Sequence, residues 1–257
     1  MTSETIIDIN ENLKLIQNIN GLTFGTDAYL LAAFTETGTY NRTVSDKIAV
    51  DLGSGSGIIP LLCASKKRFS QIYAVEIQSN FGSIIKRNAE INGFDEIIRP
   101  IITDVRDVKP SIFSKAVDVV TANPPYMTQN SGKRNKHDEK YIARHEVYGT
   151  IDDFCACACR ILKFGGKFLT VWRPDRLGDL MYSLRKNKME VKCQIFVYAH
   201  PACEPSMVLT EAIKGASPGM KVLRPLFLSD SKENSIKNIL SCDAKKIYED
   251  CSFKNFN

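Results

Sequence analysis

The segment Asn123-Pro124-Pro125-Tyr126 has the residue types needed to hold a flat group that carries an NH2. It directly follows the apolar run 116–122, which predicts a buried strand. Each proline fixes φ and has no backbone N–H, so this corner is stiff and rich in hydrogen-bond acceptors. The Asn123 amide oxygen and the Pro124 carbonyl can each accept an N–H, and Tyr126 can stack on a ring. A plain turn is the simpler interpretation, because Pro-Pro often marks turns.

A second candidate site lies upstream, where the apolar strand 48–52 leads through a glycine-rich turn into an apolar helix. Glycines occupy every second position of the turn, namely Gly53, Gly55 and Gly57. They let the backbone turn tightly and approach a ligand closely. Glu76 ends the next predicted strand, where it can accept hydrogen bonds from the 2′- and 3′-hydroxyls of a ribose, or else be a solvated strand end. Because Asp51 precedes the glycines, the order differs from the nicotinamide-binding pattern.

Strands and helices alternate along the chain, which predicts a Rossmann-like, doubly wound α/β fold with a mainly parallel sheet. Seven strands are expected, at 48–52, 71–76, 97–102, 116–122, 167–172, 191–198 and 207–213. The last two are predicted to pair antiparallel. Helices are expected over 28–34, over 58–64, from a cap at Ser79 to Asn92-Gly93, from a cap at Thr150 to Gly165-Gly166, and over 176–188.

The chain divides into three predicted parts: an N-terminal hairpin and helix (1–47), the Rossmann-like domain (48–228) and a polar C-terminal tail (229–257) that is a short helix or loose. Asn20-Gly21 lies between the short apolar runs 13–17 and 22–24 and predicts the turn of the hairpin.

Composition limits the class of partner and the compartment. The net charge of +5 permits a nucleic-acid partner without requiring one. No secretory signal and no apolar run of membrane-spanning length is present, which favours a cytoplasmic protein without a membrane partner. The eight cysteines form no CxxC pair, so we expect reduced thiols and no metal site. A monomer is favoured.

The pattern Asp51-x-Gly53-x-Gly55-x-Gly57 resembles motif I of class I S-adenosylmethionine-dependent methyltransferases. This resemblance implies S-adenosylmethionine as the cofactor and a set of residues around it. The implied residues are Thr26, Asp27, Asp51, Gly53, Gly55, Gly57, Glu76, Asp104 and Asn123. Among them, Asp104 would accept from the adenine amino group of the cofactor, and Thr26-Asp27 would close over it. Local capping of a turn or helix is the alternative for these three residues.

The corner at Asn123 resembles the amino-methyltransferases that act on adenine N6, cytosine N4 or the glutamine amide. Together with the segments 15–17, 24–32 and 142–146, it resembles the bacterial tRNA (adenine-N6) methyltransferases of valine tRNA. Their target is the adenine directly 3′ of the anticodon, at tRNA position 37. The resemblance implies Asn123, Pro124 and Tyr126 as catalytic residues and tRNA as the partner.

Basic residues beside the corner can contact RNA phosphates, although each of them can equally be a solvated surface charge. Residues 133–192 hold fourteen lysines and arginines against eight acidic residues. The candidates are Lys133, Arg134, Lys136, Arg144, Arg173 and Arg176.

Three alternatives stay open at this point. A release-factor glutamine methyltransferase shares the Asn-Pro-Pro-Tyr corner but has a helical domain before the sheet, whereas a hairpin is predicted here. A DNA adenine or another RNA base fits the same chemistry. A catalytically silent module that binds the cofactor or RNA is the third.

Overall fold

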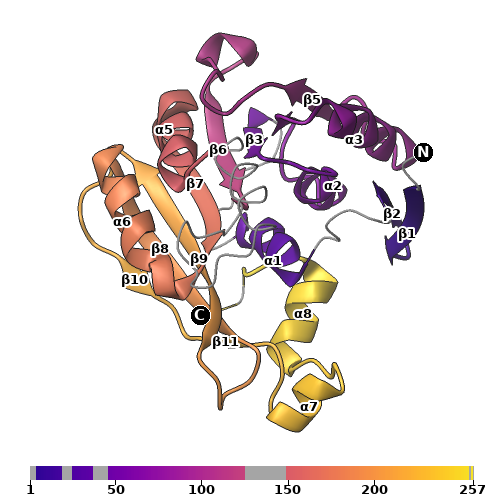
Figure 1. The fold of residues 1–257 in the computed structure, drawn as a ribbon, viewed down its shortest axis with the longest axis vertical. Coiled ribbons are helices and arrows are strands. Elements are labelled where there is room, and N and C mark those ends of the chain that lie inside the picture. Colours follow the sequence, from indigo (N-terminus) through magenta and orange to yellow (C-terminus); the bar gives the residue numbers. More distant parts are fainter. Residues whose placement is uncertain (1–3, 19–24, 37–45, 125–148, 255, 257) are drawn as a thin grey trace, which may run out of the picture.

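A mixed β-sheet forms the centre of the protein (Figure 1). The structure, a computed structural model, describes residues 4–18, 25–36, 46–124, 149–254 and 256. Seven long strands form the sheet: β3 (Ile48–Leu52), β4 (Gln71–Glu76), β5 (Ile98–Ile102), β6 (Val117–Ala122), β7 (Leu162–Trp172), β8 (Met189–Tyr198) and β9 (Pro205–Lys214). Their order is β5-β4-β3-β6-β7-β9-β8, and β9 runs antiparallel to both of its neighbours. The predicted Rossmann-like sheet is thus confirmed, and two-residue strands β10 (Lys221–Val222) and β11 (Leu226–Phe227) extend it beside β8.

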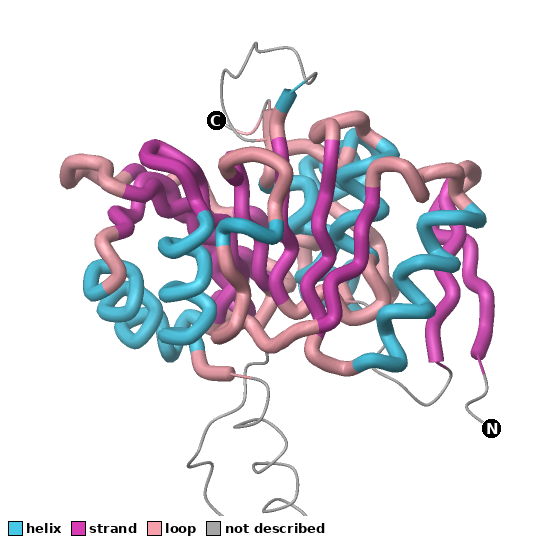
Figure 2. The backbone as a smooth tube through the Cα atoms, turned by 90° about the horizontal axis from the view of Figure 1, so that it is seen from above, coloured by secondary structure: helices cyan, strands magenta, loops and turns pink. Residues whose placement is uncertain are grey.

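Helices cover both faces of the sheet, giving three layers (Figures 1 and 2). One face packs against α1 (Thr26–Phe34), α2 (Ile58–Ser65) and α3 (Ser79–Ile91), and the other against α5 (Ile151–Ile161) and α6 (Leu177–Lys186). Strand alternation divides the core in two: Ala49 belongs to the α1–α3 side, whereas Ile48 and Val50 belong to the α5–α6 side. None of the helices in the described ranges is long and apolar enough to cross a membrane.

An N-terminal hairpin is present. Strand β1 (Glu4–Asn10) pairs antiparallel with β2 (Leu13–Asn18), so the chain reverses at residues 11–12. The Asn10 side chain accepts a hydrogen bond from Asn12 N at 3.0 Å, which stabilises this reversal as an Asx turn. Asn20-Gly21 and the expected partner strand 22–24 lie outside the described residues.

The hairpin packs on the outer side of α3, at the rim of the molecule (Figures 1 and 2). Two asparagines of α3 hold it through the backbone of β2. Asn88 Oδ1 accepts from Ile16 N at 2.6 Å and Asn88 Nδ2 donates to Ile16 O at 3.0 Å. Asn92 makes the same pair of bonds with Lys14, at 2.9 and 2.8 Å. Each side-chain amide therefore pairs with the backbone N–H and C=O of one β2 residue, as a neighbouring strand would.

The C-terminal part is helical and packed, so of the two alternatives for residues 229–257 the structure has the helical one. It contains α7 (Lys232–Ile236) and α8 (Cys242–Asp250), and α8 packs against α1. The rings of Tyr29 and Tyr248 stack at 4.6 Å, and Phe34 meets Phe253 edge to face at 5.8 Å. The apolar side chains of this segment are too few to predict burial on their own and are buried against α1, β11 and one another.

Three predicted helix boundaries are wrong. Helix α1 is capped by Gly25 without a side-chain hydrogen bond, so neither Thr26 nor Asp27 is its cap. Helix α3 begins after Gln78 rather than after a Ser79 cap. Helix α5 has the predicted Thr150 cap, which forms a capping box with Asp153, but the helix ends at Ile161, and 165–166 lie within β7. A register shift between β6 and β7 accommodates these two glycines.

Candidate active site

The site lies at the carboxyl ends of β3, β4 and β6, where the strand order reverses and doubly wound folds bind ligands. Asp51, Glu76 and Thr121 end or nearly end these three strands. By strand alternation they share a face with Ala49, Ala74 and Val119 of the α1–α3 side. The predicted polar residues are therefore gathered on one side of the sheet edge.

The glycine-rich turn between β3 and α2 forms the floor of the site. Gly53, Gly55 and Gly57 all have positive φ, at 72°, 53° and 82°. A β-carbon added to Gly57 would lie 3.3 Å from Ile85, whereas one added to Gly55 would meet nothing within 4 Å. The Gly55 position therefore combines a left-handed backbone with open space above it, which suits close approach of a ligand.

Glu76 closes this turn from the neighbouring strand. Its Oε2 accepts from Gly55 N at 2.9 Å and its Oε1 accepts from Gln78 N at 3.0 Å, and the residue is 5% exposed. A carboxylate has about four lone-pair positions, so two hydroxyls of a ribose can bind alongside these backbone donors. The residues present here fit the ribose of the expected cofactor.

Asp51 lies beneath the turn rather than facing open space. Its Oδ2 accepts from the Ser54 hydroxyl at 2.5 Å and its Oδ1 from the Thr121 hydroxyl at 2.6 Å. Burial, with a smaller contribution from the charge of Glu76, raises the pKa of Asp51 to about 7, although the two hydroxyl bonds oppose the shift. Asp51 thus ties the turn to β3 and β6.

Asp104 follows β5 and is held by the next turn. Arg106 donates its backbone N–H to Asp104 Oδ1 at 2.8 Å and pairs its guanidinium with both carboxylate oxygens, at 2.9 and 2.5 Å. This guanidinium holds the pKa of Asp104 below its ordinary value. The predicted turn cap is therefore present, and Oδ2 keeps acceptor capacity for an amino group.

Asn123 and Asp27, 96 residues apart, meet at the end of β6. Asn123 Nδ2 donates to Asp27 Oδ2 at 2.8 Å, and Asp27 Oδ1 accepts from Ala28 N at 2.9 Å. Only the NH2 end of an amide can donate to a carboxylate, so Asp27 determines which way the Asn123 amide is turned. The acceptor that Asn123 can present to an amine is consequently Oδ1.

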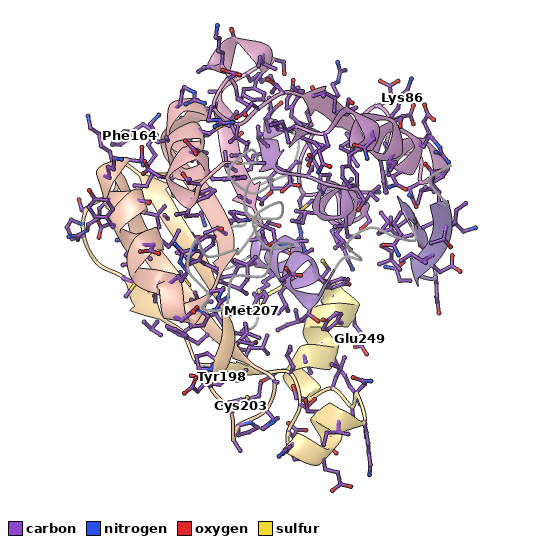
Figure 3. The ribbon with its side chains drawn as sticks, viewed as in Figure 1. Lys86, Phe164, Tyr198, Cys203, Met207 and Glu249 are labelled. Atoms are coloured by element: carbon purple, nitrogen blue, oxygen red, sulfur yellow. The ribbon has the colours of Figure 1, made fainter. Side chains whose placement is uncertain are left out.

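A cavity of about 170 Å³ adjoins this pair. Its lining residues are Thr26, Asp27, Trp172, Arg173, Ser206 and Met207. Met207, labelled in Figure 3, lies near α1 at the start of β9. Ligand pockets for drug-sized molecules measure roughly 300–1,000 Å³, so this space suits one small planar group.

The residues predicted to stack on the base and to contact RNA fall into two groups. Tyr126, Lys133, Arg134, Lys136 and Arg144 lie outside the described residues. Arg173 lines the cavity and pairs with Asp175 at 2.6 Å, while Arg176 pairs with Asp179 at 2.7 Å.

Sequence reasoning missed the far wall of the cavity. Trp172 ends β7, and Ser206 and Met207 begin β9, which runs antiparallel. The signal was available in the topology, because an antiparallel last strand begins at the edge where its parallel neighbours end. The Thr121 contact had a weaker signal, a hydroxyl in an otherwise apolar strand.

Comparisons with known proteins agree with this geometry. Residues 31–132 match the TRM5/TYW2 methyltransferase domain. A protein from Phocaeicola vulgatus named tRNA1(Val) (adenine(37)-N6)-methyltransferase is 26% identical over 185 residues, which are 72% of this chain and 74% of that relative. A relative of the same name from Aeromonas hydrophila is 25% identical over 194 residues, or 74% and 76% of the two chains.

Solved structures share the fold. A predicted O-methyltransferase from Agrobacterium tumefaciens aligns with a TM-score of 0.67 at 17% identity, covering 88% of this chain and 97% of that one. TYW2 from M. jannaschii in complex with AdoMet aligns with a TM-score of 0.55 at 15% identity, covering 82% and 86%. The matched domain, the relatives and the sheet with its glycine-rich turn together support a class I S-adenosylmethionine-dependent methyltransferase.

Proposed function

We propose that this enzyme methylates N6 of an adenine in tRNA, and specifically the adenine at position 37 of a valine tRNA. The relatives from P. vulgatus and A. hydrophila support the substrate, since both have this activity in their names. The observation that carries the chemistry is the Asn123 amide, oriented by Asp27 beside the glycine-rich turn. An amide oxygen at this point has an exocyclic amine as its natural partner.

The proposed role of Asn123 is to position a poor nucleophile. The lone pair of an adenine N6 is delocalised into the ring, so the amine needs orientation before it can attack. Asn123 Oδ1 and the Pro124 carbonyl each accept one N–H, which directs the lone pair away from both acceptors and toward the methyl group. Bound S-adenosylmethionine supplies that methyl on a sulfonium. Positioning of this kind can lower a barrier by about 7–11 kcal/mol in favourable cases.

The methyl transfer needs no side chain of the protein to act as a base. A new N–C bond forms as the S–C bond breaks, and the sulfonium becomes a neutral thioether. The nitrogen then carries an extra proton and one positive charge, which makes it strongly acidic. That proton leaves to water after transfer, so the site requires orientation rather than a general base.

The cofactor residues have separate proposed roles. Glu76 accepts from the ribose hydroxyls, Gly55 lets the cofactor approach the turn, and Asp104 Oδ2 accepts from the cofactor's adenine amine. Asp51 supports the turn from below through Ser54. Each role matches a hydrogen-bonding position described above.

The target base is proposed to enter the cavity between α1 and the ends of β7 and β9. Its volume of about 170 Å³ suits a single base turned out of its stack. Tyr126 is proposed to stack on that base. Arg173 at the rim, Arg176, Lys133, Arg134, Lys136 and Arg144 are proposed to contact the RNA backbone. A tRNA partner also implies a cytoplasmic location, and we propose that the enzyme acts as a monomer.

A methylation assay tests the proposal. The purified enzyme is incubated with isotope-labelled S-adenosylmethionine and an unmodified valine tRNA transcript, and the digest is analysed by mass spectrometry. We expect labelled N6-methyladenosine from this transcript and none when position 37 is guanine. A folded, cofactor-binding enzyme that gives no N6-methyladenosine would refute the substrate.

The variant Asn123→Ala tests the residue that carries the chemistry. We expect its turnover to fall by roughly 100-fold or more, because the amine loses its orienting acceptor. Its affinity for S-adenosylhomocysteine should stay within about threefold of wild type, since most of the binding energy for the cofactor is expected from the glycine-rich turn, Glu76 and Asp104. A normal rate in this variant would exclude the role given to Asn123.

A further inference from the structure

A buried polar atom near the end of strand β2 has no hydrogen-bond partner within the described part of the chain. Gln17 is 7% exposed, and this atom is its Oε1. Buried side-chain oxygens are nearly always satisfied in native proteins, so the exception requires an explanation. A bound ligand that donates a hydrogen bond to Gln17 Oε1 would explain it.

Gln17 lies next to the glycine-rich turn. Its neighbour Ile16 is bound through both backbone groups by Asn88, and the same Asn88 Nδ2 donates to Ser56 O at 2.9 Å. Ser56 belongs to the turn between β3 and α2. One buried asparagine side chain therefore bridges β2 and the floor of the cofactor site.

The strand pattern directs Gln17 inward. In β2 it lies on the same face as Leu13 and Leu15, which are buried in the cluster formed with α1 and α2. This is also the side of the sheet that holds Asp27 and Glu76. The Gln17 amide consequently points toward the side on which the cofactor binds.

We propose that Gln17 binds the amino-acid end of S-adenosylmethionine, its Oε1 accepting a hydrogen bond from the α-ammonium group. An ammonium is the donor that this orphan acceptor lacks, and a bond to a charged group is stronger than one between neutral groups. The inference rests on the cofactor part of the proposed function and not on the choice of RNA. It gives the N-terminal hairpin a role in cofactor binding.

The variant Gln17→Met tests the contact with two ligands, S-adenosylhomocysteine and 5′-methylthioadenosine, which lacks the amino-acid end. We expect the affinity for S-adenosylhomocysteine, measured by calorimetry, to fall roughly 10- to 100-fold, as befits one charge-assisted hydrogen bond. The affinity for 5′-methylthioadenosine should stay within about twofold. Because the substitution removes an unsatisfied buried acceptor, the melting temperature of the ligand-free variant should be equal to or above that of wild type.

Gln194→Met is the matched control. Gln194 is 2% exposed in β8, and its Nε2 donates to the Thr210 hydroxyl at 3.2 Å. We expect a lower melting temperature and unchanged affinity for both ligands.

Two outcomes of the Gln17→Met experiment would overturn the inference: affinities unchanged for both ligands, or equal losses for both. Neither measurement involves RNA. A failure of tRNA methylation would therefore refute the proposed substrate and leave the binding result to be judged separately.

Discussion

At the scale of single residues, the Asp27–Asn123 hydrogen bond is the contact on which the proposed chemistry depends. The carboxylate accepts from the amide NH2 at 2.8 Å, and this leaves the amide oxygen as the acceptor for an amine. Without the carboxylate, the amide can turn over and present its NH2 to the substrate. An NH2 cannot accept an N–H, so the turned amide would repel the target amine rather than orient it.

Replacing Asp27 should therefore slow the chemical step. We expect Asp27→Ala to lower the single-turnover rate at saturating cofactor by roughly 10- to 100-fold, the equivalent of one charge-assisted hydrogen bond. Asp27→Asn keeps an acceptor oxygen without the charge and should recover part of the rate. Saturating cofactor removes any contribution from weaker cofactor binding.

A surface aspartate provides the comparison for this series. Asp243 of α8 pairs with Arg224 at 2.5 Å, and both side chains are 41% exposed. We expect Asp243→Ala to react at the wild-type rate. An Asp27→Ala enzyme as fast as wild type, measured beside it, would show that Asn123 is oriented by something else.

At the scale of elements, the site depends on how helix α1 is held. α1 begins with Thr26 and Asp27, and a buried cation fixes its far end: Arg68 donates to Ala32 O at 2.5 Å and to the Thr35 hydroxyl at 2.8 Å. The same guanidinium donates to Cys251 O, directly after α8. One arginine therefore joins α1 to the C-terminal segment.

Replacing Arg68 should weaken the packing of α1 against the C-terminal segment. We expect Arg68→Met to lower the free energy of unfolding by roughly 2–4 kcal/mol, because buried carbonyls lose a charged donor. Urea unfolding monitored by circular dichroism measures the change. Arg87→Met is the control: Arg87 is 47% exposed and pairs with Glu4, so we expect a loss below about 1 kcal/mol. Equal stability of the two variants would contradict the role given to Arg68.

The elements of the sheet could be predicted because each strand has its own local signal. The apolar run 48–52 ends at glycines, and Thr150 caps α5 with Asp153 three residues on. Helix α8 had no such signal, since it buries only Ala244 and Ile247 and depends on α1 for its partner. The turn between β1 and β2 was not predicted, because the Asx turn at Asn10 has a weaker sequence signal than an Asn-Gly pair.

The residues of the candidate site could be predicted from the sequence, but the contacts between them could not. Motif spacing indicated Asp51, Glu76 and Asn123, which the fold gathers at one sheet edge. Spacing cannot indicate that Asp51 is buried under the turn, or that Asp27 holds Asn123 across 96 residues. Those contacts depend on how α1 packs against β6, which no local pattern specifies.

At the scale of the whole molecule, the charge distribution determines how an RNA would be held. The net charge is +5, but several basic residues near the site are already paired with acids: Arg173 with Asp175, and Arg176 with Asp179. Each pair is partly exposed and therefore weak, so a phosphate can replace the carboxylate at low cost. Such exchange makes RNA affinity sensitive to salt.

Salt dependence of tRNA binding tests this view of Arg173. Each phosphate contact adds about 0.7–0.9 to the slope of log K against log salt, since it releases a condensed counterion. We expect Arg173→Ala to weaken binding of the valine tRNA and to reduce the slope by about one contact, as measured by filter binding between 50 and 200 mM salt. Lys86→Ala is the control, because Lys86 lies at the outer edge of α3, away from the cavity marked by Met207 (Figure 3). If both variants keep the wild-type slope, the RNA backbone does not run over the cavity rim, and the path of the tRNA must lie on another face of the enzyme.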